Sequence, residues 1–83
     1  MTLSDMSRGS QCRIKAAAED NPEIQSRLYA LGVYPGVILT VLRFAPTGDP
    51  IQVRVGATLL SIRKNEAQQI LVEDGELKVT QEA

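Results

Sequence analysis

Hydrophobic and polar residues alternate over several short stretches of the chain, and this period of two is typical of strands with one buried face. The clearest stretch is 11–16, where Cys12 and Ile14 fall on one side and Arg13 and Lys15 on the other. Similar stretches follow later in the chain: 51–55, 58–63 and 69–73. The pattern therefore predicts four short, half-buried strands. It also favours Cys12 as a small core residue over a reactive thiol.

One segment follows a helical period instead and predicts a helix from about Asn21 to Leu31. Asn21 is suited to cap this helix, and Pro22 fits its first position, where the missing N–H is no loss. Gly32 ends the helix because glycine enters the left-handed conformation without a steric penalty. Val33 then stands where such helix ends place a residue that packs back on the last turn. The apolar face of the helix consists of three residues: Ile24, Leu28 and Leu31.

The segment 37–45 predicts a fifth strand, which follows the turn residues Pro35 and Gly36. This strand is apolar on both faces, with Leu39 and Val41 on one of them. The other face carries three large side chains: Ile38, Leu42 and Phe44. A half-buried strand in a small barrel normally needs only one apolar face. We therefore expect the second face to be covered, either by the helix or by another protein.

Five short strands, one helix and closely spaced turns predict a mainly β fold, a small and strongly bent antiparallel barrel with one inserted helix. Closing the sheet into a barrel removes exposed sheet edges, and the helix is placed where it can plug or cap the barrel. A length of 83 residues allows one domain, which we place at 1–75. The remaining residues, 76–83, are predicted to form a polar C-terminal tail.

Charge and composition argue against several classes of protein. Nine basic and ten acidic residues give a net charge of −1, whereas nucleic-acid-binding domains usually carry a clear positive excess. Basic side chains on the strands, such as Arg43 and Arg54, could form a mildly positive face. A solvated surface is the favoured interpretation of that face, and RNA binding is the alternative. No apolar stretch approaches the roughly 18 residues of a membrane span, and no signal peptide is evident. We expect a cytoplasmic protein without direct membrane insertion.

The sequence offers little catalytic or metal-binding chemistry. It contains no histidine and one cysteine, which removes the commonest general base, the commonest metal ligand and the usual catalytic triads. We therefore predict no catalytic residue, no cofactor and no organised metal site. Surface carboxylates such as Glu19, Asp20 and Glu73 remain, and these could hold a divalent cation only weakly. A binding or regulatory module is favoured over an enzyme.

Several short motifs follow one another between Leu3 and Glu73. In order, they are Leu3-Ser-Asp-Met6 with Gly9, Arg27-Leu-x-x-Leu-Gly-Val-x-Pro-Gly36, Ala45-Pro-Thr-Gly-Asp-Pro50, Ile62-Arg-Lys64 with Glu66-Ala67, and Ile70-x-Val72. This series resembles the FeoA family, small cytosolic proteins of bacterial ferrous iron uptake. The pieces LGVYPG and APTGDP, in this order and spacing, are its most specific part. The resemblance implies an SH3-like barrel with an inserted helix, in agreement with the pattern of strands.

The resemblance also implies a function. It identifies an accessory or regulatory protein that docks on the cytosolic part of the membrane transporter FeoB. Large apolar and aromatic groups in a shallow patch are suited to such a contact. The candidate partner-binding residues lie around the end of the helix and on the strand that follows: Leu31, Val33, Tyr34, Pro35, Ile38 and Leu42. For Leu31 and Val33, packing within the domain is favoured, whereas for Tyr34 packing and partner contact are equally favoured.

A second function is left open at this stage. FeoA domains are related to the SH3-like domains of iron-dependent repressors, so the alternative is a regulatory domain that responds to a transition metal ion. The lack of imidazole and accessible thiolate ligands gives this alternative little support. The sequence also leaves the oligomeric state open, a homo-oligomer included.

Overall fold

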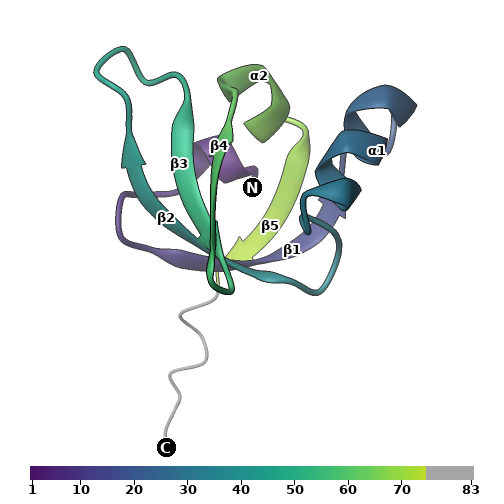
Figure 1. Ribbon diagram of the computed structural model, residues 1–83, viewed down its shortest axis with the longest axis horizontal. Coiled ribbons are helices and arrows are strands. Elements are labelled where there is room, and N and C mark those ends of the chain that lie inside the picture. Colours follow the sequence, from purple (N-terminus) through teal and green to yellow (C-terminus); the bar gives the residue numbers. More distant parts are fainter. Residues whose placement is uncertain (75–83) are drawn as a thin grey trace, which may run out of the picture.

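The computed structural model describes residues 1–74 of the chain. Its elements are the short 3-10 turn η1 (Leu3–Asp5), β1 (Gln11–Ala17), α1 (Pro22–Ala30), β2 (Ile38–Phe44), β3 (Ile51–Val55), β4 (Thr58–Ile62), α2 (Lys64–Ala67) and β5 (Ile70–Asp74). The strands form one antiparallel sheet in the order β4-β3-β2-β1-β5, so β4 and β5 are its edges. Figure 1 shows this sheet curled into a small barrel, with α2 connecting β4 to β5 across the top.

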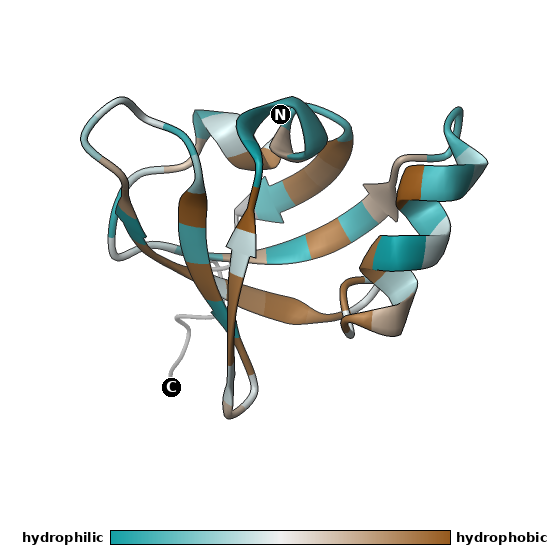
Figure 2. Ribbon diagram, turned by 45° about the horizontal axis from the view of Figure 1, so that its top comes forward, coloured by the Kyte–Doolittle hydropathy of each residue, from teal (hydrophilic) through white to brown (hydrophobic). Residues whose placement is uncertain are grey.

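The register of the strands turns apolar residues toward the interior of the barrel. Cys12 of β1 lies opposite Leu39 of β2, and Val41 lies opposite Val53 of β3. All four side chains are fully buried, as the alternation in the sequence predicts. Figure 2 shows this alternation of hydrophobic and hydrophilic residues along the strands. The buried cluster is completed by residues from the other elements: Leu3, Met6, Ile14, Ala17, Ala18, Leu28, Val33, Ile51, Ile62, Ala67, Ile70 and Val72.

All five predicted strands are present, and their ends differ from the prediction by one residue at most. The single turn of α2 also agrees with the short segment between the last two strands, which has room for only one helical turn. The predicted boundary at residue 75 and the predicted tail, 76–83, lie outside the described residues.

A bulge in β2 decides which of its side chains face the core. The pairing of β2 with β3 shifts between Val41 and Arg43, so Leu42 is an extra residue in the strand. Phe44 therefore returns to the inner side, where it lies opposite the buried Ile51 and packs against the core. The expectation that Phe44 shares the outer face with Leu42 is wrong for this reason.

Helix α1 stands beside the barrel at the end of β1 (Figure 1). The side chain of Asn21 caps its first turn by accepting a hydrogen bond from the backbone N–H of Ile24 at 3.3 Å. Leu28 is fully buried and Ile24 is partly buried against the same core. These contacts are needed because isolated helices of this length are marginal in water.

The end of α1 is fixed by the backbone of four residues. Gly32 adopts a φ of +95°, and its N–H donates to the C=O of Tyr29 at 3.0 Å. The N–H of Val33 donates to the C=O of Leu28 at 2.9 Å. This pair of hydrogen bonds is the Schellman motif, in which the residue after the glycine packs back on the helix. Val33 and Leu28 are both fully buried, as that motif requires.

Candidate functional site

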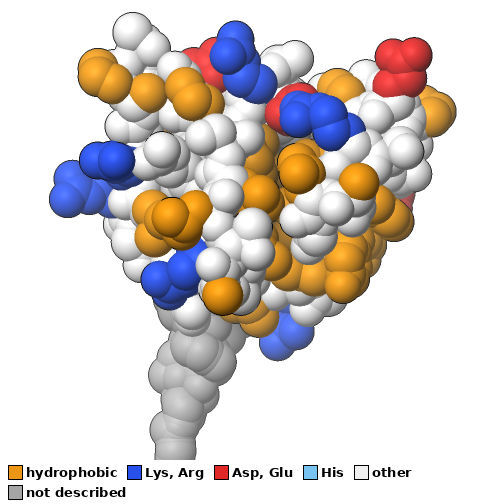
Figure 3. Space-filling model, viewed as in Figure 1, with side chains coloured by type: hydrophobic (Ala, Val, Ile, Leu, Met, Phe, Trp, Pro, Cys, Tyr) orange, Lys and Arg blue, Asp and Glu red, His pale blue; other side chains and the backbone are white. Residues whose placement is uncertain are grey.

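Large apolar side chains remain exposed around the C-terminal end of α1. Tyr29 is 43% exposed, Leu31 37%, Tyr34 46% and Ile38 38%. Together with the exposed Pro35, these residues define what we call the helix-end surface. Figure 3 shows hydrophobic side chains gathered below α1 and in the gap between α1 and the barrel. Exposed apolar residues that gather in this way on a small domain mark a candidate contact surface.

The loop that carries this surface is held by the core and by β1. Val33 is buried, and the chain then brings Tyr34 to the surface. The N–H of Gly36 donates to the C=O of Ile14 at 2.8 Å, and Arg13 Nη1 donates to the C=O of Gly36 at 3.2 Å. The exposed side chains are therefore presented on a backbone that is fixed in advance, which lowers the entropy lost on binding.

Two tyrosines of the helix-end surface contact each other. The ring centroids of Tyr29 and Tyr34 are 6.0 Å apart and the rings are tilted by 55°, within the range of favourable aromatic pairs. The reversal at Gly32 brings Tyr34 back beside the last turn of α1. Sequence reasoning missed Tyr29 because it lies outside the apolar face of the helix. The sequence feature that could have pointed to Tyr29 is its place three residues before Gly32, where the helix ends and the chain turns back.

Four of the six predicted partner-binding residues are exposed between the end of α1 and the start of β2: Leu31, Tyr34, Pro35 and Ile38. Leu31 is more exposed than the predicted packing within the domain implies. Val33 has no exposed surface and contributes only to the core, which agrees with its favoured structural interpretation. Leu42 is half-buried at the bulge, about 13 Å further along β2 than Ile38. Leu42 therefore belongs to a different part of the surface.

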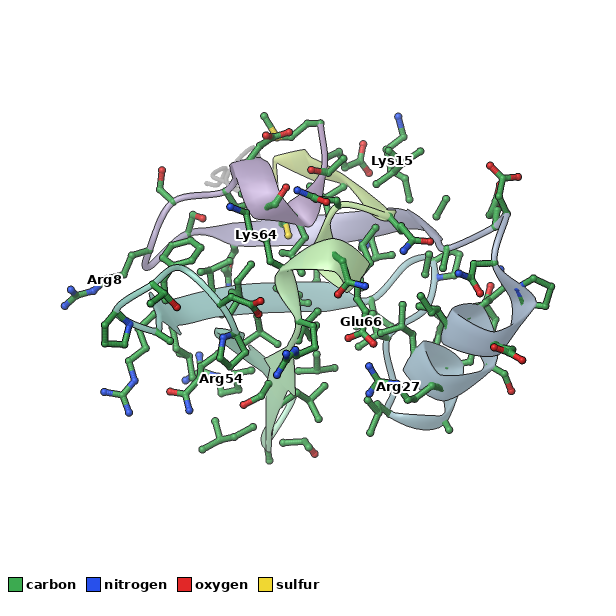
Figure 4. The ribbon with its side chains drawn as sticks, turned by 90° about the horizontal axis from the view of Figure 1, so that it is seen from above. Arg8, Lys15, Arg27, Arg54, Lys64 and Glu66 are labelled. Carbon is green, nitrogen blue, oxygen red and sulfur yellow. The ribbon has the colours of Figure 1, made fainter. Side chains whose placement is uncertain are left out.

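The charged residues near the helix-end surface are already paired. Arg13 lies opposite Ile38 in the sheet, and its Nε is 3.8 Å from a carboxylate oxygen of Glu73. Figure 4 shows Arg27 of α1 and Glu66 of α2 side by side, and the two form an ion pair. The surface itself is uncharged, with two tyrosine hydroxyls as polar groups. Such a combination suits burial against the apolar surface of another protein.

Residues 1–74 contain neither a cluster of metal ligands nor a membrane-spanning helix. No group of three or more His, Cys, Asp and Glu side chains could hold a metal ion there. Glu19 and Asp20 line a shallow pocket with Gln68 and Gln69, but they supply only two carboxylates. Within the same residues, no helix has the length and apolar character of a membrane span.

Comparisons with known proteins agree with the fold and the motifs. A family model described as the FeoA domain matches residues 1–74. The solution structure of the FeoA protein from Chlorobium tepidum is 41% identical, with a TM-score of 0.84 over 90% of this chain and 70% of that protein. Iron(II) transport protein A from Clostridium thermocellum is 35% identical, with a TM-score of 0.83 over 90% of this chain and 46% of that protein.

A third related structure is the zinc complex of FeoA from Stenotrophomonas maltophilia, described as a prokaryotic SH3 domain protein. It is 29% identical, with a TM-score of 0.76 over 88% of this chain and 89% of that protein. The five-stranded antiparallel barrel with its short helix is therefore an SH3-like FeoA fold. The chain belongs to the FeoA family of small, non-catalytic accessory proteins associated with ferrous iron transport.

Proposed function

We propose that this protein assists ferrous iron uptake by docking on the cytosolic part of the FeoB transporter through the helix-end surface. The observation that carries the proposal is the exposure of Tyr29, Leu31, Tyr34 and Ile38 between the last turn of α1 and the start of β2, where backbone hydrogen bonds fix the connecting loop. Membership of the FeoA family supports the pathway, and the related protein from Stenotrophomonas maltophilia is described as a candidate activating factor of ferrous iron transport. The proposal places the protein on the cytosolic side of the membrane.

The chemistry of the surface suggests how docking would work. Exposed tyrosine and leucine side chains stabilise a complex mainly because their apolar surface is removed from water when the partner covers it. Tyrosine is also among the residues that contribute most to binding energy at interfaces. The surface is small, so a transient contact at the low end of interface sizes is expected. Because the loop is held by Val33 and by β1, little order has to be gained on binding.

The test is direct binding to the purified cytosolic domain of the FeoB protein from the same organism. Calorimetry is carried out without nucleotide, with GDP and with a non-hydrolysable GTP analogue. We expect wild type to bind in at least one of these states and Tyr34→Ala to bind about tenfold more weakly, the loss of a residue of strong binding energy. Leu71→Ala is the matched control, because Leu71 is also 46% exposed but lies on β5.

The outcomes separate the proposal from its rivals. If no nucleotide state supports binding, docking on this part of FeoB is wrong. If Tyr34→Ala and Leu71→Ala behave alike, the partner binds elsewhere on the domain. Anaerobic titration with ferrous iron tests the metal-responsive alternative, which requires binding at micromolar metal. The described carboxylates give that alternative no three-ligand site.

A further inference from the structure

The outer face of β2, β3 and β4 carries arginines outside the helix-end surface. Arg54 of β3 lies opposite Leu59 of β4, and Arg43 of β2 lies opposite Gln52 of β3. Gln52, the partner of Arg43, is two residues from Arg54 on β3. Arg43 and Arg54 are therefore diagonal neighbours on the same face, and the Cα atoms of such neighbours are about 7–8 Å apart. The two arginines therefore reinforce one another as a positive region.

A third arginine comes from the loop before β1. This loop runs beside β2, where the N–H of Gly9 donates to the C=O of Val41 at 2.7 Å. Figure 4 shows Arg8 and Arg54 on the side of the barrel away from α1 and Glu66. We use the term basic face for five residues: Arg8, Leu42, Arg43, Arg54 and Leu59.

Within residues 1–74, the arginines of the basic face differ from the other arginines in having no acidic partner. Three arginines elsewhere form ion pairs with carboxylates: Arg13 with Glu73, Arg27 with Glu66, and Arg63 with Asp49. On the basic face, Arg43 donates instead to the neutral side chain of Gln52 at 2.6 Å. Arg8 and Arg54 form no ion pair with any residue in the part of the chain described. Soluble proteins usually intersperse charges of both signs, so this arrangement favours an anionic partner.

A hollow of mixed polar and apolar lining lies beside Arg43. It is lined by Leu42, Arg43, Gln52, Leu59, Leu60 and Ser61 and has a volume of about 260 Å³. Pockets for drug-sized ligands begin at about 300 Å³ and are more enclosed, so this hollow suits one side chain of a partner better than a small molecule. Leu59 is 70% exposed beside it, more than any other large apolar side chain described.

In the described part of the chain, the neighbouring edge of the sheet, formed by β4, is open. On the opposite edge, the N-terminus covers part of β5: Thr2 bridges Leu71, and the N–H of Val72 donates to the C=O of Met1 at 3.0 Å. No element among residues 1–74 pairs in this way with the outer side of β4. An unpaired strand edge is a ready acceptor for an added strand.

We propose that the basic face and the open edge of β4 together bind an acidic, extended segment of a protein partner. Added to β4, such a segment places every second side chain on the basic face. Its carboxylates face the guanidinium group of Arg54 on the strand next to β4, which can bind a carboxylate with two parallel hydrogen bonds. Arg43 and Arg8 lie further across the face and attract the segment through their positive charge. An apolar side chain between them fills the hollow beside Leu42 and Leu59. An anionic lipid surface would use the arginines but would leave the strand edge unpaired, so the observations favour a peptide.

The test uses a fluorescent peptide of about six residues, the usual length of a strand, in which glutamate alternates with valine. Anisotropy measures its binding to the full chain at low and at physiological salt, since exposed charge contacts weaken as salt rises. We expect the double variant Arg43→Gln/Arg54→Gln to bind at least about fivefold more weakly, since it loses the exposed charge contact at Arg54 and the longer-range attraction of Arg43. A peptide with lysine in place of glutamate, and one N-methylated on alternate residues, should both fail to bind.

The matched control is Lys15→Gln/Lys64→Gln, which removes the same charge from exposed residues of β1 and α2. This variant should bind the glutamate peptide within about twofold of wild type. Equal weakening in both double variants would mean that only net charge matters, and no binding by wild type would also overturn the proposal. Vesicles of phosphatidylcholine and phosphatidylserine test the lipid alternative. Binding to them that Arg43→Gln/Arg54→Gln abolishes, without peptide binding, would assign the face to membranes instead.

Discussion

Arg27 of α1 forms an ion pair with Glu66 of α2, and this contact joins the inserted helix to the connection between the two edge strands (Figure 4). The side chain of Glu66 is 8% exposed, whereas that of Arg27 is 49% exposed. Glu66 also accepts a hydrogen bond from the backbone N–H of Arg63 at 3.2 Å. A nearly buried carboxylate thus depends on one half-exposed arginine for its neutralisation.

Removing the arginine should cost more than removing an exposed ion pair. Arg27→Met keeps much of the side-chain volume but leaves Glu66 with only the Arg63 N–H, so we expect a loss of about 1–3 kcal/mol in the free energy of unfolding. Arg63→Met is the matched control, because the Arg63–Asp49 pair is exposed, with the two side chains 67% and 39% accessible. Its loss should be about 0–1 kcal/mol. Urea unfolding of the two variants measures both values, and equal losses would contradict a special role for Glu66.

The parts of the fold that the sequence predicts are those encoded over a few neighbouring residues. The cap at Asn21 and the stop at Gly32 each depend on local hydrogen bonds, and the structure shows both. The bulge at Leu42 depends instead on how β2 pairs with β3, and no local pattern marks it. The ion pair of Arg27 with Glu66 joins residues far apart in the chain, so no local sequence pattern predicts it either.

Gly32 should be replaceable by asparagine but not by alanine. An alanine Cβ would meet no atom within 4 Å, so its cost comes from the backbone φ of +95° alone. We expect Gly32→Ala to lower the free energy of unfolding by about 1 kcal/mol, the left-handed penalty less the entropy gained in the unfolded chain. Gly32→Asn should lose less, since asparagine tolerates this conformation at helix ends. Thermal unfolding compares them, and equal losses would show that the turn does not need a left-handed residue.

Asp5 should make stability depend on acid pH in a defined direction. A hydrogen bond from the backbone N–H of Thr2, 2.9 Å long, holds the pKa of the Asp5 carboxyl below its ordinary value of 3.8. A carboxyl whose pKa is lowered by folding stabilises the folded state above that ordinary value, and the contribution is lost as pH falls through the lowered pKa. Wild type should therefore be more stable than Asp5→Asn at neutral pH, and the difference should shrink in acid. Denaturant unfolding of both proteins across this range measures it, and a difference that does not change below pH 3.8 would contradict the assignment.

The candidate site was predictable only in part, and the reason is again the range of the contacts. The sequence assigns Val33 to the core because it follows the helix stop at Gly32. It gives Tyr34 no comparable structural role, so partner contact is as favoured as packing for that residue. Tyr29 was missed because its exposure depends on which side of α1 packs against the barrel. The sequence suggests a mildly positive face that includes Arg43 and Arg54, but only the register of β2 with β3 shows that these two residues are diagonal neighbours.

Tyr29 should act in docking through its contact with the ring of Tyr34. Both rings are partly exposed, so Tyr29→Ala should change the free energy of unfolding by no more than about 0.5 kcal/mol. Without its neighbour, Tyr34 loses one side of its packing and has more rotamers to give up on binding. We therefore expect Tyr29→Ala to weaken binding to the cytosolic domain of FeoB by about fivefold, within the cost of immobilising one additional side chain on binding.

The conservative variant separates this effect from loss of the tyrosine hydroxyl. Tyr29→Phe keeps the ring beside Tyr34 and should bind within about twofold of wild type, because only one exposed polar group is lost. Calorimetry on the three proteins gives the comparison. If Tyr29→Phe is as weak as Tyr29→Ala, the hydroxyl contacts the partner directly. If neither variant weakens binding, Tyr29 has no part in docking. The contact between the rings of Tyr29 and Tyr34 would then not affect the affinity for FeoB.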